Sequence, residues 1–313
     1  MRRSTETSQA EIRELLGQVE ALISERVGVI DRAMLEAGRQ LRLIQRIGSL
    51  YYDIDLDAAR AFGVPVCVRP IFGAIAAAEH VTLQILAVLR RAMPLQPVLW
   101  MPPERFSPAG PRRTDEDVFA FNWSGESRIG LVYGKTIGIV GFGEIGAELA
   151  RRLRAWGCHL LYSKRHRLPP QVEAALGLTH CEAEHLLRES DIVVCLLPFT
   201  RETDRWLDAR RIALMKPGAW LVHAGSGSVV DEAAVADALR TGHLAGASFD
   251  TYEWEPITPD NPLLALARDH PDSNLFLTPH VGSCHDGATN ELAALYENVC
   301  RALHGEPLEG RVA

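Results

Sequence analysis

The feature that most constrains this chain is a glycine pattern set between an apolar strand and a helix. Residues 136–140 read TIGIV, and Gly141, Gly143 and Gly146 follow in a G-x-G-x-x-G spacing before a helix-period stretch. In such a pattern the glycines permit a tight turn, close approach of a pyrophosphate and close helix packing, while the helix N-terminus attracts the phosphates. The pattern predicts a dinucleotide-binding βαβ unit; a glycine turn without a ligand is the less favoured alternative.

Beyond Lys135 short apolar stretches alternate with helix-period stretches. Continuous apolar strands separated by helices are typical of a parallel sheet that is covered on both faces. We therefore predict an α/β fold, with a doubly wound parallel Rossmann sheet for the cofactor domain and a second, smaller α/β substrate domain. The expected strands are residues 136–140, 159–163, 191–196, 219–222, 245–249 and 274–278.

The first part of the chain carries a weaker pattern. Apolar residues at three- and four-residue steps predict a helix across residues 10–35, and short strands are expected at 41–48 and 64–68, with a helix starting near Asp55 between them. A long apolar helix at 76–93 precedes a proline-rich stretch, which indicates a domain boundary there.

Composition excludes several classes of partner. The net charge of −7 disfavours nucleic acid and acidic membranes, because polyanion binding relies on a basic surface. The six cysteines form no CxxC pair, so we expect neither a disulfide framework nor a metal site. We find no apolar run of membrane-spanning length and no signal peptide, and so expect a cytoplasmic protein with a small-molecule substrate.

The end of the second strand bears on the choice of cofactor. A carboxylate that binds the ribose 2′-hydroxyl is expected about 20 residues after the glycines, but the sequence there reads YSKRHR, with Ser163, Lys164 and Arg165. Cations at this place favour a 2′-phosphate, so we predict that NADP(H) is preferred and NAD(H) possible. A solvated basic turn is the alternative.

Longer motifs resemble those of the D-2-hydroxyacid dehydrogenase family, which includes glyoxylate and hydroxypyruvate reductases and phosphoglycerate dehydrogenases. The resemblance covers nearly everything from about residue 10. It implies a substrate domain of residues 1–95 with 284–313, which would lack the family's first strand-helix-strand, and a cofactor domain of residues 96–283. The motifs are IGSLYYDIDL (47–56), AEH (78–80), GKTIGIVGFGEIG (134–146), LLPFTRETDRWLDARRIALMKPGAWLVHAG (196–225), VVDEAAVADALRTGHLAGASFDTYEWEP (229–256) and LTPHVGS (277–283).

The same resemblance implies the catalytic pair. His280 in TPH matches the catalytic acid and base, and Glu255 in WEP matches the carboxylate that holds it. Reduction of a 2-keto acid requires a proton on the carbonyl oxygen as hydride arrives, and histidine suits that transfer near neutral pH. The alternative is a structural histidine beside a surface glutamate.

Further contacts are implied for the cofactor and the substrate. The backbone of Ile47, Gly48 and Ser49 would hold the substrate carboxylate, and a homodimer would form through the cofactor domain and the segment near 96–130. Arg69, near the expected cleft, is a candidate replacement cation. The implied cofactor contacts are Gly141, Phe142, Gly143, Glu144, Ile145, Gly146, Ser163, Lys164, Arg165, Leu197, Pro198, Thr203, Ala224, Gly225, Asp250 and Gly282.

One departure puts the substrate in question. The family's N-x-x-R-G loop reads His223-Ala224-Gly225-Ser226-Gly227 here, so Ser226 stands where the substrate-binding arginine is expected. A guanidinium gives a carboxylate two charge-assisted hydrogen bonds, whereas a serine gives one neutral bond. The leading hypothesis is an NAD(P)-dependent oxidoreductase with altered substrate binding. A non-catalytic NAD(P)-binding sensor and a decayed enzyme are the alternatives. For Ser226 itself, the alternative is that it only caps the turn before Asp231.

Overall fold

The computed structural model describes residues 9–25, 28–286 and 291–313. Two compact units emerge from the chain: one comprises residues 1–76 with 283–313, and the other residues 77–282. We call them the small unit and the large unit and describe each by itself.

The large unit is built on a parallel sheet whose strands are almost entirely buried, as continuous apolar runs predict. Its strands are β4 (Thr136–Val140), β5 (His159–Ser163), β6 (Leu178–His180), β7 (Ile192–Cys195), β8 (Ala219–His223), β9 (Leu244–Phe249) and β10 (Leu275–Leu277). They run in the order β10-β9-β8-β7-β4-β5-β6. The connections reverse direction at β4, between β5 and β7, which is the doubly wound topology with its switch point at the glycine loop. The predicted fold class is confirmed; the short edge strand β6 was not predicted.

The helices of the large unit connect these strands, and several begin at a side-chain cap. Asp231, for example, accepts a hydrogen bond from the amide of Ala234 and starts the helix that follows the Ser226 loop. The helices are α4 (Phe72–Leu89), α5 (Ala92–Leu95), α6 (Glu144–Leu153), α7 (Pro170–Leu176), α8 (Ala183–Glu189), α9 (Ala209–Ile212), α10 (Glu232–Arg240) and α11 (Pro262–Asp269), with 3₁₀ turns η2 (Gln96–Trp100), η3 (Pro103–Arg105), η4 (Arg154–Trp156) and η5 (Gly227–Val229).

The small unit is a three-stranded parallel sheet with helices. Asp55 caps the central helix by accepting from the amide of Ala58, as predicted. Its elements are α1 (Gln9–Leu16), β1 (Ala21–Ser24), α2 (Arg32–Ala37), β2 (Leu43–Ile47), α3 (Leu56–Ala61), β3 (Val66–Arg69) and α12 (Glu291–His304), with strand order β1-β2-β3.

The predicted helix across residues 10–35 is wrong. The helix ends at Leu16, and Ala21–Ser24 pairs with Leu43–Arg46 as a parallel strand. The amide of Gly17 still bonds back to Arg13, but the chain then leaves the helical path. Pairing with β2 outweighs the helical spacing of the apolar residues, a case of tertiary context overriding local preference.

Helix α4 changes two other expectations. Its 18 residues have a mean hydropathy of 1.6, so by length and composition alone it passes the test for a membrane span, although half of it is buried within the protein. A core helix passes the same test. The unit boundary at residue 76 also falls inside α4, earlier than the predicted residue 95, because Val88 and Leu89 are bonded to Asn274 and Gly130 of the large unit.

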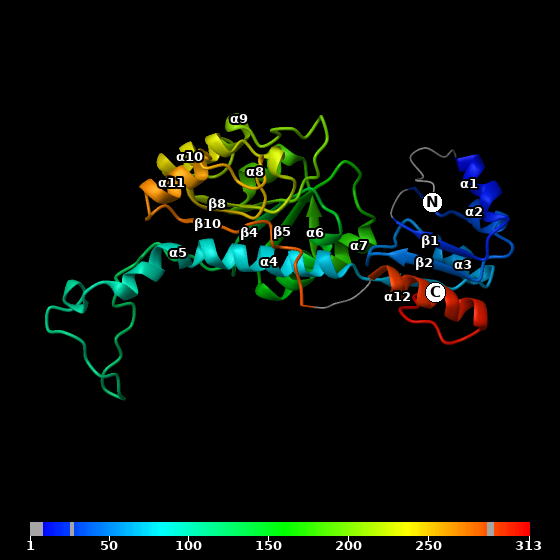
Figure 1. The fold of residues 1–313 in the computed structure, drawn as a ribbon, viewed down its shortest axis with the longest axis horizontal. Helices are drawn as coiled ribbons and strands as arrows, with labels where there is room; N and C mark the ends of the chain where they lie inside the picture. Colours follow the sequence, from blue (N-terminus) through cyan, green and yellow to red (C-terminus); the bar gives the residue numbers. More distant parts are fainter. Residues whose placement is uncertain (1–8, 26–27, 287–290) are drawn as a thin grey trace. The chain divides into compact units, whose positions relative to one another are not determined.

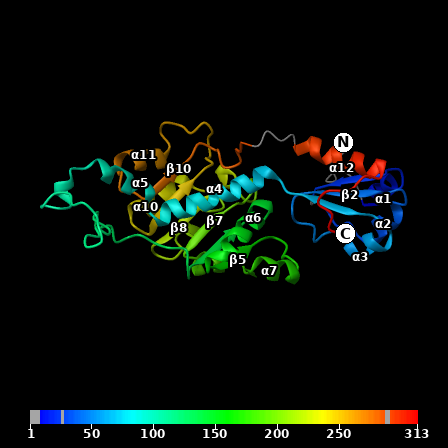
Figure 2. The same ribbon diagram turned by 90° about the horizontal axis from the view of Figure 1, so that it is seen from below.

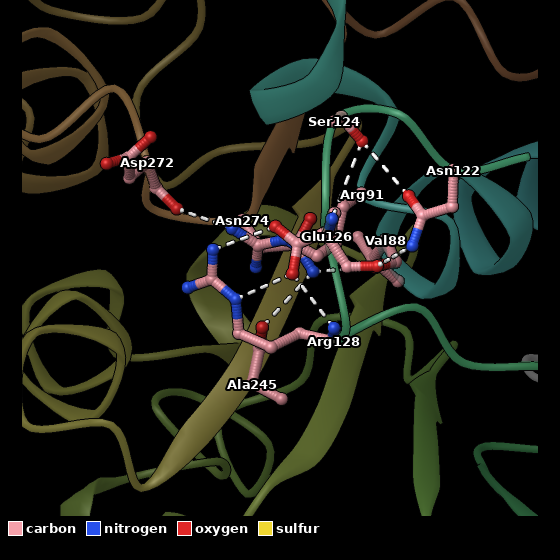
Figure 3. A network of polar contacts seen from close by, with 9 residues as sticks. All are labelled: Val88, Arg91, Asn122, Ser124, Glu126, Arg128, Ala245, Asp272 and Asn274. Atoms are coloured by element: carbon pink, nitrogen blue, oxygen red, sulfur yellow. Dashed lines mark hydrogen bonds and ion pairs between the residues drawn. The ribbon is translucent and has the colours of Figure 1, made fainter. Parts of the chain in front are cut away.

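Residues 96–130 leave the body of the large unit as an extended arm (Figure 1, and from below in Figure 2). Trp100, Phe119 and Phe121 on this arm are each more than three-quarters exposed. The root of the arm is fixed by a cluster of charges (Figure 3): Glu126 accepts from the guanidinium of Arg91 at 3.0 Å and from that of Arg128 at 2.8 and 2.9 Å. The hydrogen bonds from Arg128 lower the pKa of Glu126 to about 2, so Glu126 stays ionised at neutral pH. We call the cluster of Arg91, Glu126 and Arg128 the charged clasp.

Candidate active site

The glycine loop has the geometry of a phosphate cradle. Gly141 has φ of 85°, and a side chain there would meet the backbone of Leu196 and Leu197 at 2.7–2.8 Å, so this position requires glycine. A Cβ on Gly143, by contrast, would meet nothing within 4 Å among the described residues. Gly143 is also the N-cap of α6 and makes no side-chain cap bond. The open side of Gly143 at the N-terminus of α6 fits a pyrophosphate.

The residues after β5 lie beside this cradle, but part of their charge is already paired. Arg165 bonds to Glu202 at 2.9 Å, and Arg167 is held by Glu173 at 2.9 Å through two nitrogens. Glu173 also accepts from the hydroxyl of Tyr162. Both the Arg165 and the Glu202 side chains are more than 70% exposed, so their ion pair is weak and easily exchanged.

The loops after β7 and β8 are tied to each other through Ser226. Its amide donates to the carbonyl of Leu197 at 2.9 Å, and its hydroxyl accepts from the amide of Phe199 at 2.9 Å. Ser226 is the N-cap residue of the turn η5, but its hydroxyl makes no cap bond there, so the interpretation of this side chain as a turn cap is wrong. Thr203 closes its own loop, because its hydroxyl donates to the carbonyl of Pro198 at 2.7 Å.

His280 and Glu255 are brought together, although 25 residues separate them in the chain. Nδ1 of His280 lies 2.6 Å from Oε2 of Glu255, whose other oxygen accepts from the amide of Tyr252 at 3.0 Å. His280 has φ of 53°, an uncommon backbone conformation for a residue with a side chain. Its side chain is 57% exposed, so Nε2 is the ring nitrogen that a ligand can reach.

Asp250 lies beneath the loop that carries His280. Its carboxylate accepts from the amides of Val281 and Gly282 and from the hydroxyl of Thr278, which in turn contacts His80. Burial favours the neutral acid, yet the hydrogen bonds, that of His80 first, hold the pKa of Asp250 well below its usual range. Asp250 and Gly282 were expected here. His80 was not, and the only signal was its place in the AEH motif.

His223, at the end of β8, is fully buried. Neither ring nitrogen has a hydrogen-bond partner among the described residues, and the ring packs edge-on against Phe249. Desolvation lowers the pKa of His223 to about 4, so the ring is neutral at physiological pH. No sequence pattern around His223 indicates that its ring is buried.

The candidate substrate residues lie in the small unit, at the carboxyl ends of β2 and β3. Gly48 donates its amide to the carbonyl of Arg69 at 2.7 Å, so in this structure that amide is not available to a substrate carboxylate. The guanidinium of Arg69 lies 3.7 Å from Glu309, and its Nε is buried without a hydrogen-bond partner among the described residues. The roles of Ile47 and Ser49 stay predictions.

Among the residues that the structure describes, no three His, Cys, Asp or Glu side chains are grouped to hold a metal ion. The cofactor candidates instead follow β4, β5, β7, β8, β9 and β10, at the carboxyl edge of one sheet, where ligands of open α/β sheets bind.

A family model described as D-isomer specific 2-hydroxyacid dehydrogenase, NAD binding domain, matches residues 110–282. The chain belongs to this family. The protein is therefore a D-2-hydroxyacid dehydrogenase-like oxidoreductase that uses a nicotinamide cofactor.

Named members of the D-2-hydroxyacid dehydrogenase family are similar over most of the chain. Glyoxylate reductase of Thermococcus onnurineus is 34% identical over 303 residues, which cover 96% of this chain and 85% of the relative. D-3-phosphoglycerate dehydrogenase of Mycobacterium leprae is 33% identical over 92% of this chain, but only 50% of that longer relative is covered. Among solved structures, a glyoxylate reductase from Paecilomyes thermophila matches with a TM-score of 0.56 and 28% identity, covering 95% of this chain and 85% of that one.

Proposed function

We propose that the protein is an NADPH-preferring reductase of a 2-keto acid or a related small anionic substrate, with substrate binding altered by Ser226. The observation that carries the proposal is the His280–Glu255 pair at 2.6 Å, with Glu255 anchored to the amide of Tyr252. Such an arrangement serves proton transfer, whereas a structural histidine on the surface needs no anchored carboxylate.

The pair fixes which atom carries the proton. Because Glu255 accepts from Nδ1–H, the second proton of the imidazolium sits on Nε2, the exposed nitrogen, and can pass to a carbonyl oxygen. Glu255 stabilises the imidazolium and holds the ring plane. A bound nicotinamide cofactor supplies the hydride, while Asp250, Gly225 and the glycine loop bind and orient it. In the reverse direction neutral His280 accepts the proton from the hydroxyl group of the hydroxy acid.

Preference for NADPH is supported by the residues after β5. Ser163, Lys164 and Arg165 include two cations and no carboxylate, so nothing there repels a 2′-phosphate. Glu202 contacts Arg165 through a weak ion pair. A 2′-phosphate that displaced Glu202 would gain a bidentate partner at little cost.

The substrate carboxylate needs a different partner once position 226 is serine. The Ser226 hydroxyl already accepts from Phe199 and retains one proton to donate. Arg69 is the cation that we propose in its place, because its contact with Glu309 is long at 3.7 Å and therefore exchangeable. A panel of 2-keto acids identifies the substrate that this combination of Ser226 and Arg69 accepts.

The test is cofactor oxidation with a panel of 2-keto acids, run with NADPH and with NADH. We expect turnover with at least one acid, faster with NADPH, and a fall of roughly 10²- to 10⁴-fold in His280→Ala with cofactor affinity unchanged. Turnover by Glu255→Gln should fall less than turnover by His280→Ala. Unchanged turnover in His280→Ala would show that this histidine is not the acid.

Ser226 also favours a second candidate, a non-catalytic NAD(P)-binding sensor or a decayed enzyme. Its hydroxyl ties two loops together where a cation would face the substrate. This reading predicts cofactor binding in calorimetry and no oxidation with any acid in the panel, in wild type and His280→Ala alike.

We also propose a cytoplasmic homodimer that associates through the arm. The exposed aromatic side chains at residues 100, 119 and 121 line or adjoin a cavity of about 560 Å³ on the arm, and the charged clasp at Glu126 fixes its root. A second copy is the partner that would bury them. Sedimentation should give twice the monomer mass, and Phe119→Asp with Phe121→Asp should give the monomer.

A further inference from the structure

A chain of hydrogen bonds runs from helix α4 to the loop of the catalytic histidine. Nε2 of His80 lies 2.9 Å from the hydroxyl oxygen of Thr278, and that hydroxyl donates to Oδ1 of Asp250 at 2.6 Å. The amides of Val281 and Gly282, the two residues after His280, donate to the same carboxylate at 3.0 and 2.7 Å. His80 and Asp250 are 12% and 3% exposed, so the chain is largely shielded from water.

The geometry assigns the direction of each bond. Thr278 has one hydroxyl proton, and its short bond to a carboxylate uses it, so the oxygen must accept from His80. His80 therefore carries a proton on Nε2. Without this donor the hydroxyl of Thr278 has a second acceptor within reach, the carbonyl of Phe249 at 3.4 Å. His80 thus keeps the hydroxyl of Thr278 turned toward Asp250.

Counting acceptors shows what this arrangement leaves open. An ionised carboxylate offers about four acceptor positions. Oδ1 of Asp250 accepts from Thr278 and Val281 and also lies 3.4 Å from Nε2 of His80, whereas Oδ2 accepts only from Gly282 among the described residues. One position on Oδ2 is left within the described part of the chain. Packing is tight around it, because a Cβ on Gly282 would lie 2.7 Å from Oδ2 and 3.3 Å from the ring of His80.

We propose that His80 is a positioning residue for the nicotinamide end of the cofactor: through Thr278 and Asp250 it fixes the open position of Oδ2 for the nicotinamide carboxamide and steadies the loop that carries His280. The inference rests on the proposed function, in which Asp250 binds that carboxamide. His80 itself touches neither cofactor nor substrate. It gives α4 a polar connection to the catalytic loop, 198 residues away in sequence.

A pair of ligands isolates this effect. NADPH and 2′-phospho-ADP-ribose share the adenosine and diphosphate groups, but only NADPH carries nicotinamide. Calorimetry with both should show that His80→Leu weakens NADPH binding roughly 3- to 10-fold, the range expected for one hydrogen bond, and leaves 2′-phospho-ADP-ribose unchanged. His80→Gln, whose amide nitrogen reaches close to the position of Nε2, should restore most of the NADPH affinity.

Gln84→Leu is the matched control. Gln84 lies one turn further along α4, is fully buried, and its side-chain amide has no hydrogen-bond partner among the described residues. The variant thus removes a buried polar group from the same helix outside the chain, and both affinities should stay at the wild-type value. Should His80→Leu fold poorly, Thr278→Val breaks the chain from the other side and should show the same selective loss.

The outcomes separate the two levels of the argument. Equal weakening of both ligands in His80→Leu, or no weakening of either, would overturn the role of His80 while the cofactor site stands. A wild-type protein that binds NADPH no better than the fragment would overturn the role of Asp250 and with it this inference. If NADH proves the tighter ligand, the same comparison is made with NADH and ADP-ribose.

Discussion

Replacing His223 by leucine should remove most of one acid-induced loss of stability. The His223 ring is fully buried, and burial lowers its pKa from 6.5 to about 4. The unfolded chain therefore binds this proton first as the pH falls, so stability due to the neutral ring is complete above pH 6.5, declines between 6.5 and 4, and declines no further below. At about 1.4 kcal/mol per pH unit, the full loss is on the order of 3 kcal/mol.

The assay is urea unfolding of wild type and His223→Leu at pH 7, 6, 5 and 4, followed by tryptophan fluorescence. All six tryptophans lie between residues 100 and 254, so the signal reports on the large unit alone. The difference in free energy of unfolding between variant and wild type should grow as the pH falls, by about 3 kcal/mol in total. The contributions of the other titrating groups to the pH dependence are common to both proteins and cancel in that difference.

His159→Leu is the control, since His159 is exposed at the start of β5 and meets water whether or not the chain is folded. Its stability should follow the wild-type curve with pH. Parallel curves for His223→Leu and wild type would refute the reasoning, because they would mean that the ring of His223 is solvated or bonded in the folded protein.

Three further outcomes follow from the site. Gly143→Ala should melt like wild type, because a Cβ there meets no described atom, but should lose cofactor affinity. Gly141→Ala should lower the melting temperature. If Gly143→Ala bound the cofactor like wild type, Gly143 would not be part of the phosphate site. Glu202→Gln should raise affinity for NADPH and leave that for NADH unchanged, since only a 2′-phosphate competes for Arg165; equal changes for both cofactors would contradict this. Ser226→Arg should raise turnover of glyoxylate or hydroxypyruvate by up to about 10²- to 10³-fold. Ser226→Ala, which loses only the bond to Phe199, should not raise it. A folded, cofactor-binding Ser226→Arg without any gain would show that the serine at position 226 does not determine the substrate.

The sequence was most informative where local chemistry alone decides the structure. The glycine loop and the buried strands around it were predicted because a positive φ and a fully apolar run leave few alternatives. The helix across residues 10–35 was wrong because the partner of Ala21–Ser24 lies about 20 residues away in β2, and pairing with it outweighs local spacing.

Long-range contacts explain what the sequence missed at the site. No sequence pattern near His80 predicts that Thr278 lies 2.9 Å from its ring, and none near Gly48 predicts that its amide bonds to the carbonyl of Arg69. His280 and Glu255 were found only because their motifs resemble those of a family, since histidine and glutamate alone do not indicate a pair.

The departure that bears on the substrate is in the loop after β8, where Ser226 stands at the position expected for arginine. Contacts that need no cation hold that loop in place: Ser226 bonds to Leu197 and Phe199, and Gly225 packs so closely that a Cβ would lie 2.6 Å from the carbonyl of Leu197. The backbone of this loop is therefore supported without an arginine at position 226. The His280–Glu255 pair depends on Tyr252 and on the loop at Asp250, not on this loop. We therefore expect proton transfer and cofactor binding to be retained, and the choice of substrate to be the property that Ser226 changes.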